Sequence, residues 1–222
     1  MVEKDVELIL RIIGEAGYGE AYPGRNRGSP PSWSREPFHV LVATVLSQRT
    51  KDENTFNASD RLFARYEGPV EMSKASVDDL VDLVRPAGFP RAKAKAIKEI
   101  ARLVHEEHND QVPRDIEILL TFPMVGRKTA NCVLAYAFED DAICVDTHVH
   151  RISNRLGLVE TRTPDETEMV LRNIIPRSLW RSINRLMVVF GQKICRPRHP
   201  LCEECPVNGL CDCYASLKKD DL

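Results

Sequence analysis

Four cysteines lie close together near the end of the chain, and their thiol groups are suited to binding metal. Cys195, Cys202, Cys205 and Cys211 form the pattern C-x6-C-x2-C-x5-C, which Cys213 follows. Four thiolates in one short loop repel one another unless a cation or an inorganic cluster neutralises them. A four-cysteine zinc site usually has two C-x2-C pairs, and this segment has one. The spacing therefore favours an iron–sulfur cubane, with Cys213 not ligating, over zinc or unrelated core thiols.

A lysine follows a short proline–glycine turn in the middle of the chain. Residues 119–138 read LLTFPMVGRKTANCVLAYAF, which predicts a turn at Pro123 to Gly126 and a helix that begins near Arg127. The N–H groups and the dipole at such a helix start favour an anion, for example a phosphate. Lys128 lies in the first turn beside Arg127, and both the dipole and the neighbouring cation favour its neutral amine. Lys128 is a candidate nucleophile, weighed against the commoner case of a surface lysine at a helix start.

An aspartate stands before another expected helix. Residues 143–151 read ICVDTHVHR, in which Asp146 precedes the helical segment. Its carboxylate can cap that helix, or it can face the same site as Lys128. His148 and His150 are two residues apart and face different directions on a helix, so we do not expect them to share a metal ion.

The elements that would position these groups are predicted to be helices. Apolar periodicity predicts them at residues 6–13, 38–48, 52–66, 77–84 and 91–108, from residue 163 onward, and at 178–190. Ser76 and Thr163 are suited to cap two of them. Because no segment alternates with period two for long, we expect an all-α chain. Residues 22–37, crowded with Pro, Gly, Ser and Arg, are predicted to be a linker.

The composition describes a globular chain with unevenly distributed charge. Of 222 residues, 43% are hydrophobic and 29% charged, which argues against disorder, and no apolar run approaches the roughly 18 residues of a membrane span. The formal net charge is only -2, but two stretches, 85–98 and 181–200, hold Arg and Lys and no acidic residue. The N-terminus resembles neither a secretory signal nor a transit peptide, so we expect a cytoplasmic location.

Three motifs in this order resemble a known family. PMVGRKTAN, VDTHVHR and the cysteine pattern resemble the helix-hairpin-helix DNA glycosylases of the endonuclease III family over Phe38 to Cys211, and VLSQRTKDENT at 45–55 resembles its archaeal branch. The resemblance implies the helix-hairpin-helix glycosylase fold, with a six-helix domain at 38–140. Residues 1–37 and 141–222 would form a second helical domain that carries a [4Fe–4S] cluster on the four cysteines. It also implies that the protein is a monomer, that it acts on DNA in the nucleoid, and that it has no membrane partner.

The resemblance implies a bifunctional glycosylase and AP lyase of base excision repair that removes oxidised pyrimidines such as thymine glycol. In the family, a lysine at the position of Lys128 attacks C1′ of the damaged nucleotide. An aspartate at the position of Asp146 assists departure of the base, and β-elimination then breaks the strand 3′ to the lesion. Relatives that only excise bases carry Ser or Tyr in place of the lysine, so Lys128 favours the bifunctional reaction.

The same resemblance implies contacts with double-stranded DNA that holds a damaged base or an abasic site. Either Gln48 or Arg49 would fill the gap left by the extruded base, and Phe89 would insert beside the unpaired base, unless it is a core aromatic. Independently, the acid-free stretch at 85–98 favours a second phosphate-facing edge, formed by Arg91, Lys93, Lys95 and Lys98. The family's hairpin commonly has Gly where this chain has Met124. The remaining expected DNA contacts are Pro123, Val125, Gly126, Arg127, His148, Arg196 and Arg198.

Two alternatives share much of this sequence evidence. A mismatch glycosylase that removes T or U opposite G would have the same fold and cluster. A noncatalytic iron–sulfur protein that binds DNA through the hairpin would keep the cysteines and the basic residues. The joint presence of Lys128 and Asp146 argues against the noncatalytic protein.

Overall fold

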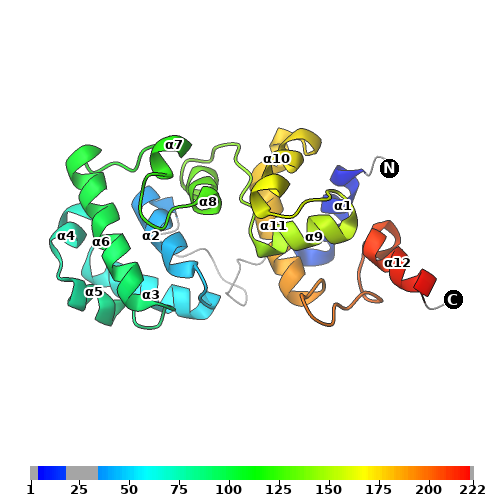
Figure 1. Ribbon diagram of the computed structural model, residues 1–222, viewed down its shortest axis with the longest axis horizontal. Helices are drawn as coiled ribbons and strands as arrows, with labels where there is room; N and C mark the ends of the chain where they lie inside the picture. The colour runs from blue at the N-terminus through cyan, green and yellow to red at the C-terminus, as the bar shows by residue number, and fades with distance from the viewer. Residues whose placement is uncertain (1–4, 19–34, 221–222) are drawn as a thin grey trace. The chain divides into compact units, whose positions relative to one another are not determined.

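The computed structural model describes residues 5–18 and 35–220, which form helices and loops and no strand (Figure 1). The prediction of an all-α chain is confirmed. The predicted linker lies, apart from residues 35–37, outside the described residues. The chain divides into two compact units, Met1–Gly28 with Ile143–Leu222, and Ser29–Ala142. No helix in the described ranges is long and apolar enough to cross a membrane.

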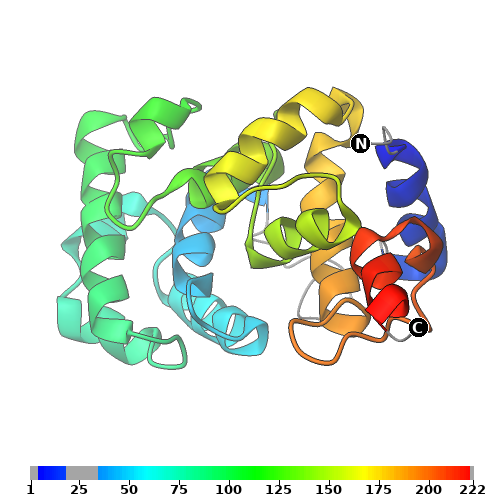
Figure 2. The same cartoon turned by 45° about the vertical axis from the view of Figure 1, so that its right-hand side comes forward.

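The first unit joins the N-terminal helix to the last third of the chain. Helices α9 and α11 pack against each other, as the yellow-green and orange ribbons of Figure 2 show, and α11 also contacts α1. Gly191 makes this packing possible, because a Cβ there would stand 2.4 Å from His148 Nδ1. The elements are α1 (Val6–Ile13), η1 (Gly14–Tyr18), α9 (Thr147–Leu156), α10 (Pro164–Ile174), η3 (Arg177–Leu179), α11 (Trp180–Lys193), η4 (Asn208–Leu210) and α12 (Asp212–Asp220).

The second unit is built around α2, an apolar helix that is buried almost all round. It contacts α3, α6 and α8, while α6 packs on α4 and α5. The described residues of this unit hold six helices of six residues or more and the single-turn α7. Their bounds are α2 (Pro37–Ser47), α3 (Asp52–Arg65), α4 (Pro69–Lys74), α5 (Val77–Leu83), α6 (Pro90–Glu107), α7 (Ile116–Leu119) and α8 (Arg127–Ala137).

The helix starts follow the predicted capping residues. Ser76 Oγ accepts a hydrogen bond from the Asp79 N–H at 3.1 Å, and Thr163 Oγ1 accepts one from the Glu166 N–H at 3.2 Å. Each bond satisfies one of the backbone donors that the first turn of a helix leaves unpaired. These two caps confirm where the sequence predicted that α5 and α10 begin.

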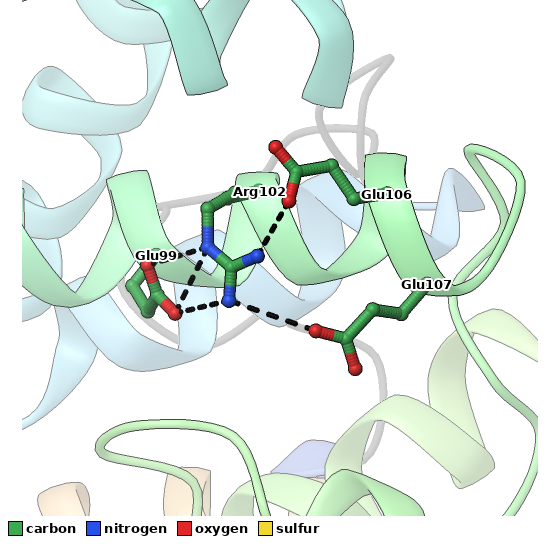
Figure 3. A network of polar contacts seen from close by, with 4 residues as sticks. All are labelled: Glu99, Arg102, Glu106 and Glu107. Carbon is green, nitrogen blue, oxygen red and sulfur yellow. Dashed lines mark hydrogen bonds and ion pairs between the residues drawn. The ribbon is translucent and has the colours of Figure 1, made fainter.

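The exposed face of α6 carries a network of charges (Figure 3). Arg102 lies 2.7 Å from Glu99 and 2.5 Å from Glu106, and 3.6 Å from Glu107. Hydrogen bonding to Arg102 lowers the pKa of Glu99. The network keeps this face polar, and the opposite face of α6, with Ile97 and Ile100, enters the core.

Candidate functional site

The turn before α8 has the predicted form of a hairpin between two helices. Leu119 ends α7 and Arg127 begins α8. Phe122 is buried, and its carbonyl accepts the Val125 N–H at 3.1 Å, so Val125 shapes the turn. Gly126 is the N-cap of α8 and has no side chain to cap the first turn. The start of α8 is therefore a suitable place for an anion, because the helix dipole is positive there.

Met124 adopts the left-handed conformation within this hairpin, with φ of 61°. Such a φ is easy for Gly and costs a residue with a Cβ about 1–2 kcal/mol. The Cβ of Met124 therefore strains the backbone here. The side chain is 37% exposed, so the covered part offsets some of this strain.

We expect Met124→Gly to be more stable than Met124→Ala by about 1 kcal/mol, because both lose the packing of the methionine side chain and only Gly relieves the strained φ. For a chain of this size that gain raises Tm by about 2–4 °C in a thermal denaturation experiment. Met124→Ala is the control, since it keeps the Cβ and the strain. Equal Tm values for the Gly and Ala variants would contradict this account.

Lys128 is the second residue of α8, as the sequence predicted, and lies directly after Arg127. Both side chains are half-buried, whereas Thr129 and Ala130 on the next positions enter the core. A lysine in the first turn experiences the positive end of the helix dipole, which disfavours its protonated form. That Lys128 is the nucleophile stays a prediction.

Gln48 and Arg49 stand at the end of α2 and have different surroundings. Gln48 Nε2 donates to Met124 O at 2.7 Å and lies 3.4 Å from Thr129 Oγ1, so this side chain ties α2 to the hairpin. Arg49 is exposed, has φ of 52°, and places its guanidinium 5.0 Å from the ring centroid of Phe89. Arg49 is therefore the better candidate to enter a DNA duplex.

Phe89 is the N-cap of α6 and is also left-handed, with φ of 58°. Its side chain is 58% exposed, so the interpretation of Phe89 as a core aromatic is wrong. A large apolar side chain held in solvent by a strained backbone is a feature expected of a functional site.

Lys93 does not face phosphates, contrary to the prediction. It is 1% exposed, and its ammonium donates to Leu46 O, Gln48 O and Thr50 Oγ1 at 2.7 Å each. Burial lowers its pKa to about 8. Two other cations of this stretch are engaged within the protein: Arg91 pairs with Asp78 at 3.1 Å, and Lys98 donates to the backbone at 2.6 Å.

Asp146 is the N-cap of α9 in the first unit. Its Oδ1 accepts hydrogen bonds from the His148 N–H at 2.9 Å and the Val149 N–H at 2.8 Å. The predicted capping role is confirmed. The two bonds fix the orientation of the half-buried carboxylate, because they hold one oxygen against the helix start.

The two histidines of α9 face different partners, as predicted. His148 Nδ1 lies 3.1 Å from Arg151 Nη2, beside Gly191 of α11. His150 Nδ1 lies 2.7 Å from Thr167 Oγ1, which belongs to α10. Each ring therefore contributes to packing within the first unit, and the two do not converge on one ion.

The four candidate cysteine ligands line one pocket in the loop between α11 and α12, together with Cys213. The loop is fixed by its own backbone: the Cys205 N–H donates to Cys202 O at 3.3 Å. Asn208 Nδ2 also donates to Cys202 O, at 3.2 Å. The sequence pattern thus brings these side chains to one place.

The chemistry of these thiols fits a cationic centre. Burial raises the pKa of Cys205 to about 11 and also raises those of Cys202 and Cys211. Thiols of this kind stay protonated at neutral pH unless a cation stabilises the thiolates. Among the described residues, no group of three or more His, Cys, Asp or Glu is placed to hold a single metal ion. Cys195, Cys202, Cys205 and Cys211 would instead hold an iron–sulfur cluster.

Arg151 and Arg155 of α9 hold the start of the cysteine loop. Neither was predicted from the sequence to be a positioning residue. Arg151 Nη2 donates to Cys195 O at 2.8 Å. Arg155 Nη1 donates to Arg196 O at 2.6 Å and lies 3.5 Å from Cys195 Sγ. Their spacing of four residues places them on one face of the helix, which is the signal that could have revealed them. Arg196 and Arg198 themselves are exposed, as expected for phosphate contacts.

Comparison with known proteins first defines the class. Residues 42–177 match the model of the HhH-GPD superfamily, described as base excision DNA repair proteins. Residues 195–211 match the iron–sulfur binding domain of endonuclease III. The chain is thus a helix-hairpin-helix DNA repair protein that carries an iron–sulfur centre.

The relatives define the family more closely. Endonuclease III of Thermotoga maritima is 52% identical over 187 residues, which cover 84% of this chain and 88% of that protein. A structure titled as a trapped endonuclease III–DNA covalent intermediate matches with TM-score 0.87 and 31% identity, over 98% of this chain and 99% of that one. A thermostable thymine-DNA glycosylase matches with TM-score 0.81 and 25% identity, over 95% and 96%.

The chain belongs to the endonuclease III family. It is a DNA glycosylase and AP lyase of base excision repair, its cofactor is a [4Fe–4S] cluster, and its partner is DNA. The predictions of family, fold, enzyme class and cofactor are confirmed. The similarity of residues 45–55 to the archaeal branch stays a prediction.

Proposed function

We propose that this protein excises oxidised pyrimidines such as thymine glycol from duplex DNA and cuts the strand at the resulting abasic site, with Lys128 as nucleophile and Asp146 as its acidic partner. The observation that carries the proposal is the placement of Lys128 in the first turn of α8, after a hairpin that ends in the glycine cap Gly126. That placement favours a neutral amine and, beside it, a bound phosphate.

The chemistry follows from these two groups. The neutral amine of Lys128 attacks C1′, the bond from C1′ to the base breaks, and the base leaves with the electron pair and takes up a proton. The negative charge of Asp146 stabilises the positive charge that develops on the sugar. After the sugar ring opens, the amine and C1′ form a Schiff base. Loss of a proton from C2′ then expels the 3′ phosphate, and water releases Lys128.

We propose that Cys195, Cys202, Cys205 and Cys211 hold the cluster, because these four line one pocket at the spacing given above. When bound, the cluster neutralises the four thiolates and joins them into one rigid loop. Arg196 and Arg198 stand in that loop and are exposed, so they are suited to contact DNA phosphates.

Cys213, which lines the same pocket as the four proposed ligands, allows a test of this ligand set. We expect Cys211→Ser to lose iron and the visible absorbance of the cluster, because one iron loses its thiolate. Cys213→Ser, the matched control two residues away, should retain both. The measurement is iron per protein together with the absorption spectrum of the purified variants. If Cys213→Ser also loses the cluster, the ligand assignment is incomplete.

For the DNA interface we propose two groups of residues. Arg49 and Phe89 enter the duplex beside the extruded nucleotide, Pro123, Gly126 and Arg127 contact the DNA backbone from one unit, and His148, Arg196 and Arg198 contact it from the other. Gln48 and Val125 contribute by shaping the hairpin, since Gln48 binds Met124 O and Val125 is buried within the turn. We propose that the protein has two domains. One consists of residues 38–140, and the other consists of residues 1–37 together with 141–222.

The test uses duplexes that carry thymine glycol, an abasic site or a G·T mismatch, each incubated with purified protein and borohydride. A covalent adduct and a cut strand with thymine glycol support the proposal. The likeness to a thymine-DNA glycosylase makes mismatch excision the second candidate, and faster release of T from G·T than of thymine glycol would favour it. No adduct together with no released base from any duplex would contradict both. We further propose a monomer that works on nucleoid DNA inside the cell.

A further inference from the structure

Lys93 is a buried ammonium that the proposed reaction does not use. It lies four residues into α6, close to the positive end of the helix dipole, where a cation is disfavoured. Its three hydrogen bonds of 2.7 Å go to Leu46 O, Gln48 O and Thr50 Oγ1. These acceptors satisfy all three N–H groups of the ammonium. All three lie at the end of α2 or in the turn that follows it.

Thr50 connects this ammonium to a second loop. Its Oγ1 accepts from Lys93 and from the Gly88 N–H at 3.0 Å, and its hydroxyl donates to Gln48 O at 3.2 Å. The hydroxyl therefore uses its donor and both acceptor positions. A Cβ on Gly88 would stand 2.8 Å from Arg49 O, so the backbones of the two loops are in direct contact.

The two loops carry the residues proposed to enter DNA. Arg49 and Phe89 both have positive φ, and the guanidinium of Arg49 lies over the ring of Phe89. Residues with a Cβ keep such conformations only where the surrounding contacts determine the backbone. The bonds of Lys93 and Thr50 are those contacts, because they fix the carbonyl before Arg49 and the amide before Phe89.

We propose that Lys93 is a positioning residue, which acts through Thr50 to hold Arg49 and Phe89 as one preformed wedge for extrusion of the damaged nucleotide. The inference rests on the proposed function. Because Lys93 itself is 1% exposed, it acts on DNA only through these two residues.

The experiment compares Lys93→Met and Thr50→Val with wild type. Lys93→Met removes the ammonium and keeps the length of the side chain; Thr50→Val removes the hydroxyl and keeps the shape. In duplex DNA, we expect single-turnover excision of thymine glycol to fall at least about 10-fold, with a matching loss of the 2-aminopurine fluorescence that reports base extrusion. Borohydride trapping at an abasic site in single-stranded DNA, which needs no wedge, should stay within about 2-fold of wild type.

Matched controls separate positioning from folding. Lys98→Met removes another lysine of α6 whose ammonium binds a carbonyl, and it should match wild type in both assays. Thr50→Ser keeps the hydroxyl and should restore duplex excision. If Lys93→Met fails to fold, the comparison of Thr50→Val with Thr50→Ser tests the inference by itself.

Two results would overturn the inference. The first is excision from duplex DNA at the wild-type rate by Thr50→Val and, if it folds, by Lys93→Met. The second is a loss of activity in these variants that is equally large with single-stranded and with duplex substrates. Absence of excision and of the fluorescence change in the wild-type protein would instead refute the proposed function.

Discussion

Lys128→Gln protein is expected to bind a thymine glycol duplex with unchanged affinity and to give no covalent adduct with borohydride. The amide of glutamine cannot form the Schiff base, so both the adduct and strand cleavage disappear. Gel separation of the borohydride-treated mixture measures the adduct, and fluorescence anisotropy measures binding. This is the largest effect that we expect from any single substitution.

Lys128→Arg is the matched control for charge. It keeps a cation in the first turn of α8, yet the guanidinium stays protonated and is not a nucleophile. Both variants should therefore lack the adduct. An adduct of undiminished yield with either one would show that another amine reacts, and the assignment of Lys128 would fail.

Asp146→Asn is expected to slow excision of thymine glycol by about 10²–10⁴-fold, the range for loss of a positioned acid or base. The structure makes this substitution informative. Asn caps helices about as well as Asp, so the start of α9 should keep its two hydrogen bonds while the negative charge is lost. Single-turnover kinetics and thermal denaturation on the same preparation measure the two properties separately.

Asp146→Ala separates the contribution of the Asp146 charge to excision from its contribution to stability as a helix cap. It removes both the charge and the cap, and loss of such a cap costs about 1 kcal/mol. We therefore expect Asp146→Ala and Asp146→Asn to be similarly slow, but only the Ala variant to have a lower Tm. Fast excision by Asp146→Asn would assign Asp146 a purely structural role.

Much of the fold was predictable because its signals are local. The caps Ser76 and Thr163 and the apolar faces of the longer helices identify the elements within three residues of their observed ends. Helix α4 was missed, since six residues are too short for an amphipathic repeat to emerge. The hairpin and Asp146 were found because a turn and a cap are also determined by neighbouring residues.

The site residues that depend on distant contacts were harder to predict. Lys93 shares a helix face with Ile97 and Ile100, so its position indicated burial, but its charge suggested solvent. The acceptors that permit its burial come from the end of α2, more than 40 residues earlier. The exposure of Phe89 depends on the left-handed backbone at the start of α6, which the sequence pattern does not indicate.

Helix α9 links the cysteine loop to the candidate acid within one unit. Asp146 caps its first turn, and Arg155, near its last, holds Cys195 and the backbone of Arg196. A helix of ten residues is about 15 Å long and behaves as a stiff rod over that length. We therefore expect loss of order in the cysteine loop to disturb the orientation of Asp146 as well. A preparation with incomplete iron should then contain both active and inactive molecules, and its specific activity should report the fraction that holds a cluster.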